Sequence, residues 1–298
     1  MADDNGAAPA PTVQPGDIRE IADQVWVIPD RRVPLVPNIG IVAGRDAVLV
    51  VDTGLGPANG AAVLRAAQRI AGGRRLLLTL THFHPEHGFG AQAFRDAATI
   101  VYNRAQRDDL LTKGAAYLAM FRGFGPAIGA ALAGTELVGP HIAYDGTSCD
   151  LELGDRRVTL RNWGRAHTNA DQVVWLAQER VLFTGDLAEE RMFPIFPWFP
   201  PDDTDIDGAN WARVLEACAA LAPAVVVPGH GAVGDAAILV AVRGYMRDVA
   251  AQVAAARADG HDAAAIVATL APAIRARYPD WQAPEWIDFA IRYYASPG

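Results

Sequence analysis

The sequence is poor in cysteine and in positive charge, and both shortages narrow what the protein can do. Its 298 residues include only two cysteines, Cys149 and Cys218, whose spacing fits neither a metal site nor a redox pair. Two thiols in a reducing compartment are therefore expected, with a single disulfide as the alternative. The 26 Lys and Arg residues are outnumbered by 34 Asp and Glu, which leaves a net charge of −8. Nucleic acids and anionic membrane surfaces bind clustered positive charge, so neither is expected as a partner.

Long apolar runs and leader segments are missing as well. No apolar stretch reaches 18 residues without a charge or a helix breaker, so the sequence predicts no membrane-spanning helix. The N-terminal segment is acidic and rich in Ala and Pro, and it lacks the basic start and apolar stretch of a signal peptide. This favours a cytoplasmic protein unless a leader has been removed. Residues 1–17 are expected to form a disordered tail.

What is present is the composition of a globular protein, in which 51% of residues are hydrophobic and 20% are charged. Apolar periodicity and β-branched runs predict strands at residues 24–28, 38–43, 47–52, 76–81, 99–103, 150–153, 157–163, 172–176, 181–184 and 224–227. Helices are predicted at 60–71, 208–221 and 285–294, with a helical insertion at about 104–135 and a C-terminal helical extension at about 234–298. Two strand-rich halves with helices predict one α/β domain over residues 18–298, whose two sheets pack together between helices.

Three histidines and a carboxylate lie within six residues, directly after the predicted strand that ends at Thr81. They are His82, His84, Glu86 and His87. Residues two apart in an extended segment point the same way, so His82 and His84 can bind one metal ion. Glu86 and His87 can then face a second ion. Histidine and carboxylate are usual ligands of zinc, and a strand end holds them with little freedom. The alternative is a polar surface cluster, and the density of the run argues against it.

Three further side chains follow predicted strands. They are His167, Asp186 and His230. Taken alone, each histidine is more often a structural or surface residue, and an aspartate after a strand is usually a turn or cap residue. Together with the first cluster, however, these residues are more often metal ligands than structural residues. Asp186 is then the one carboxylate placed to bridge two ions.

Together these motifs resemble the metallo-β-lactamase superfamily, whose pattern is His-x-His-x-Asp-His followed by a distant His, an Asp and a final His. The match runs from about residue 24 to residue 231. The resemblance implies a four-layer αβ/βα sandwich that binds two zinc ions. It implies that His82, His84 and His167 bind the first ion, that Glu86, His87 and His230 bind the second, and that Asp186 bridges both. Asp52 matches the buried aspartate that orients the ligands, with a helix cap or a turn as the alternative.

The sequence departs from the family pattern at Glu86, where the family has aspartate. The side chain of Glu86 is one methylene longer. We therefore expect the second zinc site to be weaker than the first, or to bind another divalent metal.

The resemblance implies a dinuclear zinc hydrolase in which a zinc-bound hydroxide attacks a carbonyl group, with Asp186 and Glu86 as the catalytic carboxylates. The small-molecule substrate would be an ester, a lactone, a thioester or a β-lactam. Two alternatives remain open, a mononuclear iron-dependent oxygenase on the same fold and a non-catalytic metal-binding module.

Aromatic residues just beyond Asp186 offer an apolar surface for a substrate. They are Phe193, Phe196, Trp198 and Phe199, and they either line the pocket or pack a loop. Acidic residues lie between them and Asp186, so we favour an uncharged, apolar ester or lactone. Further aromatic residues at 117–124 and 286–294 are either lids or structural cover.

Overall fold

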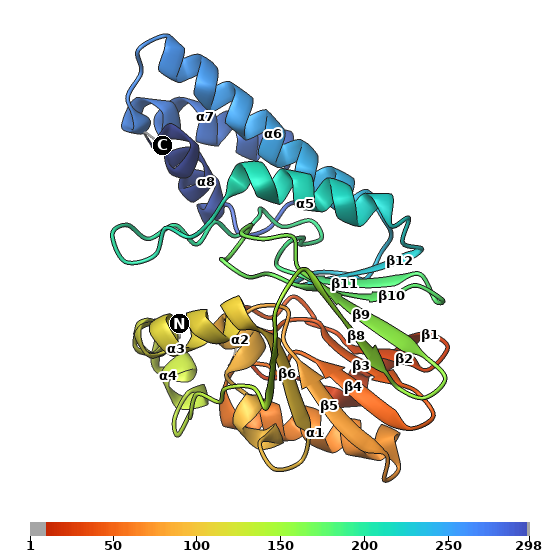
Figure 1. The fold of residues 1–298 in the computed structure, drawn as a ribbon. Helices are drawn as coiled ribbons and strands as arrows, with labels where there is room; N and C mark the ends of the chain where they lie inside the picture. The colour runs from red at the N-terminus through yellow and green to blue at the C-terminus, as the bar shows by residue number, and fades with distance from the viewer. Residues whose placement is uncertain (1–9, 297–298) are drawn as a thin grey trace, which may run out of the picture. The chain divides into compact units, whose positions relative to one another are not determined.

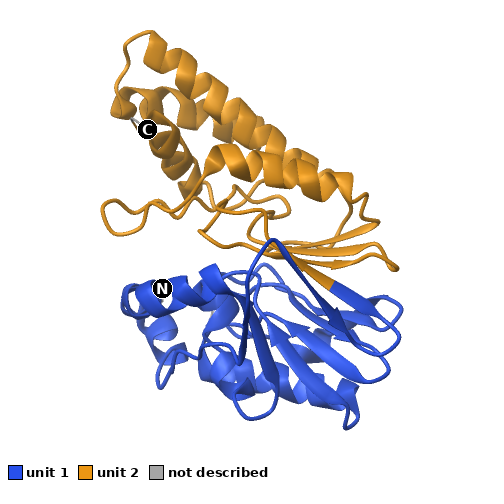
Figure 2. Cartoon of the chain, in the orientation of Figure 1, with its two compact units in different colours: residues 1–158 blue, residues 159–298 orange. Residues whose placement is uncertain are grey.

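A computed structural model describes residues 10–296 of the chain. The chain divides between Val158 and Thr159 into two compact units (Figure 2). Each unit has its own hydrophobic core, and one domain over residues 18–298 stays a prediction. No helix in the described residues combines the length and hydrophobicity that crossing a bilayer requires.

The first unit is built on a seven-stranded sheet whose strands are adjacent in chain order. The strands are β1 (Arg19–Ala22), β2 (Val25–Ile28), β3 (Ile39–Ala43), β4 (Ala47–Val51), β5 (Arg75–Thr79), β6 (Thr99–Asn103) and β7 (Ile142–Tyr144). Neighbours are antiparallel from β1 to β4 and parallel from β4 to β7. Every residue of β3 and β4 is buried, as expected of strands covered on both faces.

Helix α1 (Gly56–Ala71) makes the crossover that the parallel pair β4–β5 requires, and it lies along one face of the sheet (Figure 1). Pro57 sits in its first turn, where the missing N–H costs nothing. Gly72 ends the helix in a left-handed conformation. At Gly60 the helix backbone meets the loop backbone at Gly90, and a Cβ on Gly60 would lie 2.0 Å from the Gly90 carbonyl oxygen.

Residues 10–17 are more ordered than the predicted tail. Val13 is buried in the core of the first unit, and its N–H donates to Asn59 Oδ1 over 2.9 Å. The Asn59 amide in turn donates to the Pro11 carbonyl over 2.6 Å. These contacts attach the segment to α1, so the ordered chain begins before residue 18. Residues 1–9 of the predicted tail lie outside the described residues.

Two helices occupy the predicted insertion, α3 (Arg104–Arg122) and α4 (Pro126–Ala131). Asn103, the last residue of β6, begins α3 by accepting a hydrogen bond from the Gln106 backbone N–H over 2.8 Å. Strand β8 (Ser148–Glu152) follows β7 and completes the first unit.

The second unit contains the strand order β12-β11-β10-β9. Its strands are β9 (Arg157–Arg161), which begins at the boundary between the units, β10 (Val173–Leu176), β11 (Val181–Gly185) and β12 (Val225–Pro228). Strand β10 is antiparallel to β9 and β11, and β12 is parallel to β11 through the crossover helix α5 (Gly208–Ala220). Three helices form the C-terminal extension, α6 (Ala237–Ala258), α7 (Ala263–Arg277) and α8 (Glu285–Ala295). Helices α5 and α6 lie over this sheet (Figure 1), and Trp211 and Val242 join its strand residues in one core.

We expect Gly60→Ala to destabilise the protein by about 1–3 kcal/mol, because the added methyl group would overlap the backbone at Gly90. Denaturant unfolding measures the change. Gly244→Ala is the matched control, since Gly244 is an exposed residue within α6 whose Cβ would meet no atom within 4 Å. That change should stabilise the protein by about 0.5–1 kcal/mol. Equal effects of the two substitutions would contradict the close approach at Gly60.

Candidate metal-binding site

The four ligand candidates of the first unit lie on residues 80–88, which we call the ligand loop. Strand β5 ends at Thr79, two residues earlier than predicted, and the chain then bends into the single-turn helix α2 (Pro85–Gly88). Because α2 begins directly after His84, it turns Glu86 and His87 out of the line of the preceding residues. His82 and His84 do lie together as predicted, with ring centroids 4.6 Å apart. All four candidate side chains are buried.

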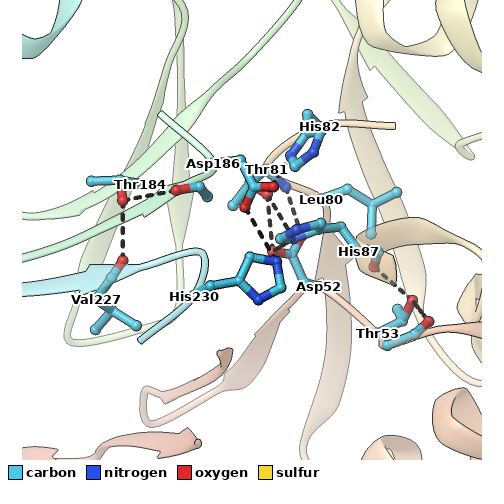
Figure 3. Close-up of polar contacts among 12 residues, drawn as sticks. Asp52, Thr53, Leu80, Thr81, His82, His87, Thr184, Asp186, Val227 and His230 are labelled. Atoms are coloured by element: carbon cyan, nitrogen blue, oxygen red, sulfur yellow. Dashed lines mark hydrogen bonds and ion pairs between the residues drawn. The ribbon is translucent and has the colours of Figure 1, made fainter. Parts of the chain in front are cut away.

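A buried carboxylate, that of Asp52, holds the ligand loop (Figure 3). Its Oδ1 accepts from the Thr81 N–H over 2.7 Å, and its Oδ2 accepts from the Thr81 hydroxyl over 2.9 Å. Oδ2 also lies 2.9 Å from His87 Nδ1. An ionised carboxylate only accepts, so His87 carries its proton on Nδ1 and turns the Nε2 lone pair outward. Asp52 therefore contacts the ligand loop at Thr81 and at His87, and its role in orienting metal ligands stays a prediction.

Thr53 fixes the backbone of His87 and was not identified from the sequence. Its hydroxyl donates to the His87 carbonyl over 2.8 Å (Figure 3). Its N–H donates to the same carbonyl, also over 2.8 Å. The Thr53 hydroxyl also accepts from the Gly90 N–H over 3.2 Å. The sequence signal was its place after Asp52 at the end of β4, from which the strand end can reach the loop after β5.

In the second unit, His167, Asp186 and His230 are buried and follow strands β9, β11 and β12. His167 Nδ1 donates to the Ile195 carbonyl over 2.9 Å, which leaves Nε2 as the atom that can bind a metal. That Nε2 lies 4.0 Å from Asp186 Oδ2. His230 Nε2 lies 3.7 Å from the other carboxylate oxygen, Oδ1 (Figure 3).

These two separations fit a metal site better than a network of direct hydrogen bonds. Both exceed the length of a hydrogen bond. An ion about 2.0–2.2 Å from a histidine nitrogen and from a carboxylate oxygen would leave the two ligand atoms roughly this far apart. Asp186 points one oxygen at each histidine, which is the arrangement that a bridging carboxylate needs.

Gly229 makes room for the Asp186 carboxylate. A Cβ at this position would lie 2.0 Å from Asp186 Oδ1. The Gly229 N–H donates to the carbonyls of Gly185 and Ala188, over 2.9 and 3.0 Å, and so ties the chain after β12 to the chain after β11. The glycine is therefore part of the site although it offers no ligand. The sequence predicted a role for the neighbouring His230 but gave no indication of one for Gly229.

Asp171 stabilises the turn that carries His167, a role that was not predicted from the sequence. Its carboxylate accepts from the Thr168 N–H over 2.8 Å and from the Thr168 hydroxyl over 2.9 Å. Burial raises the pKa of Asp171, against the opposing effects of His167 and of these hydrogen bonds. A Thr-x-x-Asp pattern after His167 is the local signal for such a turn.

The aromatic residues predicted to line a pocket separate into two groups. Phe193 and Phe196 are fully buried in the core of the second unit. Phe193 contacts Tyr245 and Trp281, with ring centroids 5.5 and 5.4 Å away. Phe196 contacts Trp211 at 5.2 Å. Both therefore serve core packing, which corrects the expectation for these two. Trp198 and Phe199 retain exposed surface, and their place in a pocket stays a prediction.

The described residues thus include two groups of buried His, Asp and Glu side chains that could hold metal ions. The sequence model of the metallo-beta-lactamase superfamily matches residues 32–230. The chain therefore belongs to the metallo-beta-lactamase superfamily, whose members are mostly hydrolytic enzymes. This confirms the family and the fold that the sequence predicted.

Solved structures show the same fold. The DIM-1 metallo-beta-lactamase is 18% identical, with a TM-score of 0.60 over 79% of this chain and 97% of its own. A metallo-beta-lactamase from Pontibacter korlensis is also 18% identical, with a TM-score of 0.61 over 76% of this chain and 98% of its own. The sec-alkylsulfatase Pisa1 from Pseudomonas sp. is 15% identical, with a TM-score of 0.73 over 94% of this chain and 50% of its own. Comparison with curated protein sequences finds no match.

We expect Asp52→Asn to lower metal affinity by about 10- to 100-fold, the usual loss when a group that supports a ligand is removed. The asparagine amide would turn its N–H₂ either toward the Thr81 N–H or toward the Thr81 hydroxyl and His87 Nδ1, so at least one of these donors would lose its acceptor. Competition with a chromogenic chelator measures the affinity. Asp46→Asn is the control, because Asp46 is a half-exposed aspartate of the same unit. Equal affinities of the two variants would show that Asp52 does not support the ligands.

Proposed function

We propose that this protein is a dinuclear zinc hydrolase that activates water for attack on a carbonyl carbon. The observation that carries the proposal is the Asp186 carboxylate, whose two oxygens face two different buried histidines at separations that fit metal ions. Zinc, when bound, would lower the pKa of a coordinated water to about 7 and would polarise the substrate carbonyl.

The donors divide into two sets of buried nitrogen and oxygen ligands. The proposed ligands of the first ion are His82, His84 and His167, those of the second are Glu86, His87 and His230, and Asp186 would bridge both. Three histidines and one bridging oxygen would leave the first ion room for water or substrate as a fifth ligand, a coordination number that catalytic zinc can reach. With Asp186, the second set contains two carboxylates, whose negative charge offsets that of the ions.

The other residues prepare the ligands. Asp52 keeps the His87 proton on Nδ1, and the Ile195 carbonyl does the same for His167, so each ring offers Nε2. Asp186 lies against Gly229, and Gly185 before it adopts a positive φ of 53°, which turns the chain sharply at the end of β11. These supports hold the donors in place before a metal or a substrate arrives.

The charges near Asp186 support an uncharged substrate. Glu189 and Glu190 follow Asp186 within four residues, and Glu189 is buried. Carboxylates at this position disfavour an anionic group on the substrate. The partly exposed rings of Trp198 and Phe199 favour an apolar one. We therefore propose an uncharged ester or lactone as the substrate class.

Metal analysis of protein expressed without added metal, followed by a hydrolysis screen, tests this proposal. We expect about two zinc ions per chain, and turnover of apolar esters or lactones ahead of thioesters and β-lactams. About one iron per chain would indicate the oxygenase alternative. A chain that binds no metal, or that binds zinc and hydrolyses none of the four substrate classes, would overturn the proposal.

Asp186→Asn should lower kcat by about a hundredfold or more, because the amide removes the charge that offsets two dications. The screen should be repeated with this variant at equal protein and zinc concentrations. Asp202→Asn serves as the control, since Asp202 is an exposed aspartate of the same unit. Wild-type activity and two tightly held ions in the Asp186→Asn protein would show that this residue is not a ligand.

Glu86 makes the second metal site the weaker one in this proposal. Its side chain is one methylene longer than that of aspartate, so it must either change rotamer or displace the second ion. Chelator titration should release metal in two separate steps, with the easier step from the Glu86 set. Glu86→Asp should move the two steps closer together if the loop backbone is placed as in the family, and should widen the gap if the backbone suits glutamate. A single concerted release from the unmodified protein would contradict the weaker second site.

A further inference from the structure

Helix α3 contacts the ligand loop at three points along its length. Near its start, Gln106 Nε2 donates to the Leu80 carbonyl over 3.2 Å, and Gln106 is buried. Two turns later, the ammonium of Lys113 lies 5.7 Å from the centre of the Phe83 ring. One turn further, the Tyr117 ring stacks on His84. Residues spaced by seven and four lie on one face of a helix, so α3 presents a single continuous face to the loop.

The contact between Tyr117 and His84 is the one that involves a proposed metal ligand. The ring centroids lie 5.0 Å apart and the ring planes are inclined by only 21°. Tyr117 also meets Phe83 edge to face, with centroids 5.0 Å apart. Both Tyr117 and His84 are buried. One face of the imidazole is therefore covered, and rotation of His84 about its Cβ–Cγ bond would drive its edge into the tyrosine ring.

Lys113 and Asp109 form an ion pair on this face of α3. Lys113 is the only lysine in the sequence, and its side chain is 17% exposed. Its ammonium lies 3.7 Å from the Asp109 carboxylate, one turn earlier on α3, and that carboxylate is buried. The charge of Lys113 is thus offset within the helix by Asp109, while its ammonium lies over the Phe83 ring.

We propose that Tyr117 is a positioning residue, which fixes the ring plane of His84 by stacking and so sets the strength of the metal site. The inference rests on the proposed function, because it takes His84 to be a ligand. It assigns the helical insertion a role beyond structural cover. Asp52 and the Ile195 carbonyl fix their histidines through hydrogen bonds, whereas α3 fixes His84 through the face of an aromatic ring.

Three variants separate positioning from general stability. Tyr117→Leu removes the flat ring, Tyr117→Phe keeps it, and Leu110→Ala loosens the packing of α3 at another buried residue of the same helix. Each variant is loaded with cobalt, whose visible absorption reports ligand geometry, and is then titrated with a chelator. Thermal unfolding of the metal-free proteins records stability separately.

We expect Tyr117→Leu to weaken the tighter of the two metal sites by about tenfold or more and to shift its cobalt spectrum, as for loss of a ligand's support. Tyr117→Phe should match the wild type within about twofold. Leu110→Ala should lower the melting temperature and leave metal affinity within about twofold.

Two results would overturn the inference while leaving the proposed function intact. One is a folded Tyr117→Leu protein that binds metal as tightly as the wild type. The other is an equal loss of affinity in Leu110→Ala, which would show that α3 acts only through stability. If Tyr117→Leu does not fold, a Tyr117→Phe protein with weakened metal binding would equally overturn it. Wild-type protein that binds no metal would instead overturn the proposed function, and this inference with it.

Discussion

A single buried carboxylate at the end of β4 determines where the ligand loop lies. Asp52 reaches this place through a left-handed backbone conformation, with φ of 67°, which aspartate tolerates better than most residues. From there its two oxygens take up the Thr81 N–H, the Thr81 hydroxyl and the His87 ring. A buried negative charge with three such contacts is costly to move, because each donor would lose its acceptor. The loop is thus held at both ends of its histidine run by a residue on the neighbouring strand.

In the second unit, a backbone carbonyl and a glycine position the ligand candidates. The Ile195 carbonyl holds His167, and Gly229 lets the chain after β12 approach the Asp186 carboxylate directly. In both units the strand ends give the coarse position of each donor, and hydrogen bonds from short connecting segments then set its direction.

The sequence predicted most of the strands and helices well, because apolar patterns follow local rules. Strand β6 and the start of helix α5 lie where the apolar patterns placed them, and the donors follow strands as their spacing indicated. The misses involve residues whose roles arise only in three dimensions. Helix α1 begins four residues early, because Pro57 suits a first turn and the apolar period does not register it. Gly229 and Tyr117 act through close approach to a distant residue, and no periodicity encodes that. Phe193 and Phe196 were assigned to a pocket because an aromatic run carries no sign of which ring faces the core.

The solitary lysine of α3 has a practical consequence for handling the protein. Reagents that couple to primary amines have only one side-chain target in this sequence, Lys113. That ammonium lies beside Phe83, in the middle of the ligand loop, and is mostly covered. Amine-based immobilisation or dye labelling of Lys113 would therefore act on a side chain packed against the ligand loop. For surface attachment of the native protein, a coupling chemistry aimed at carboxylates or at an added tag is the better choice.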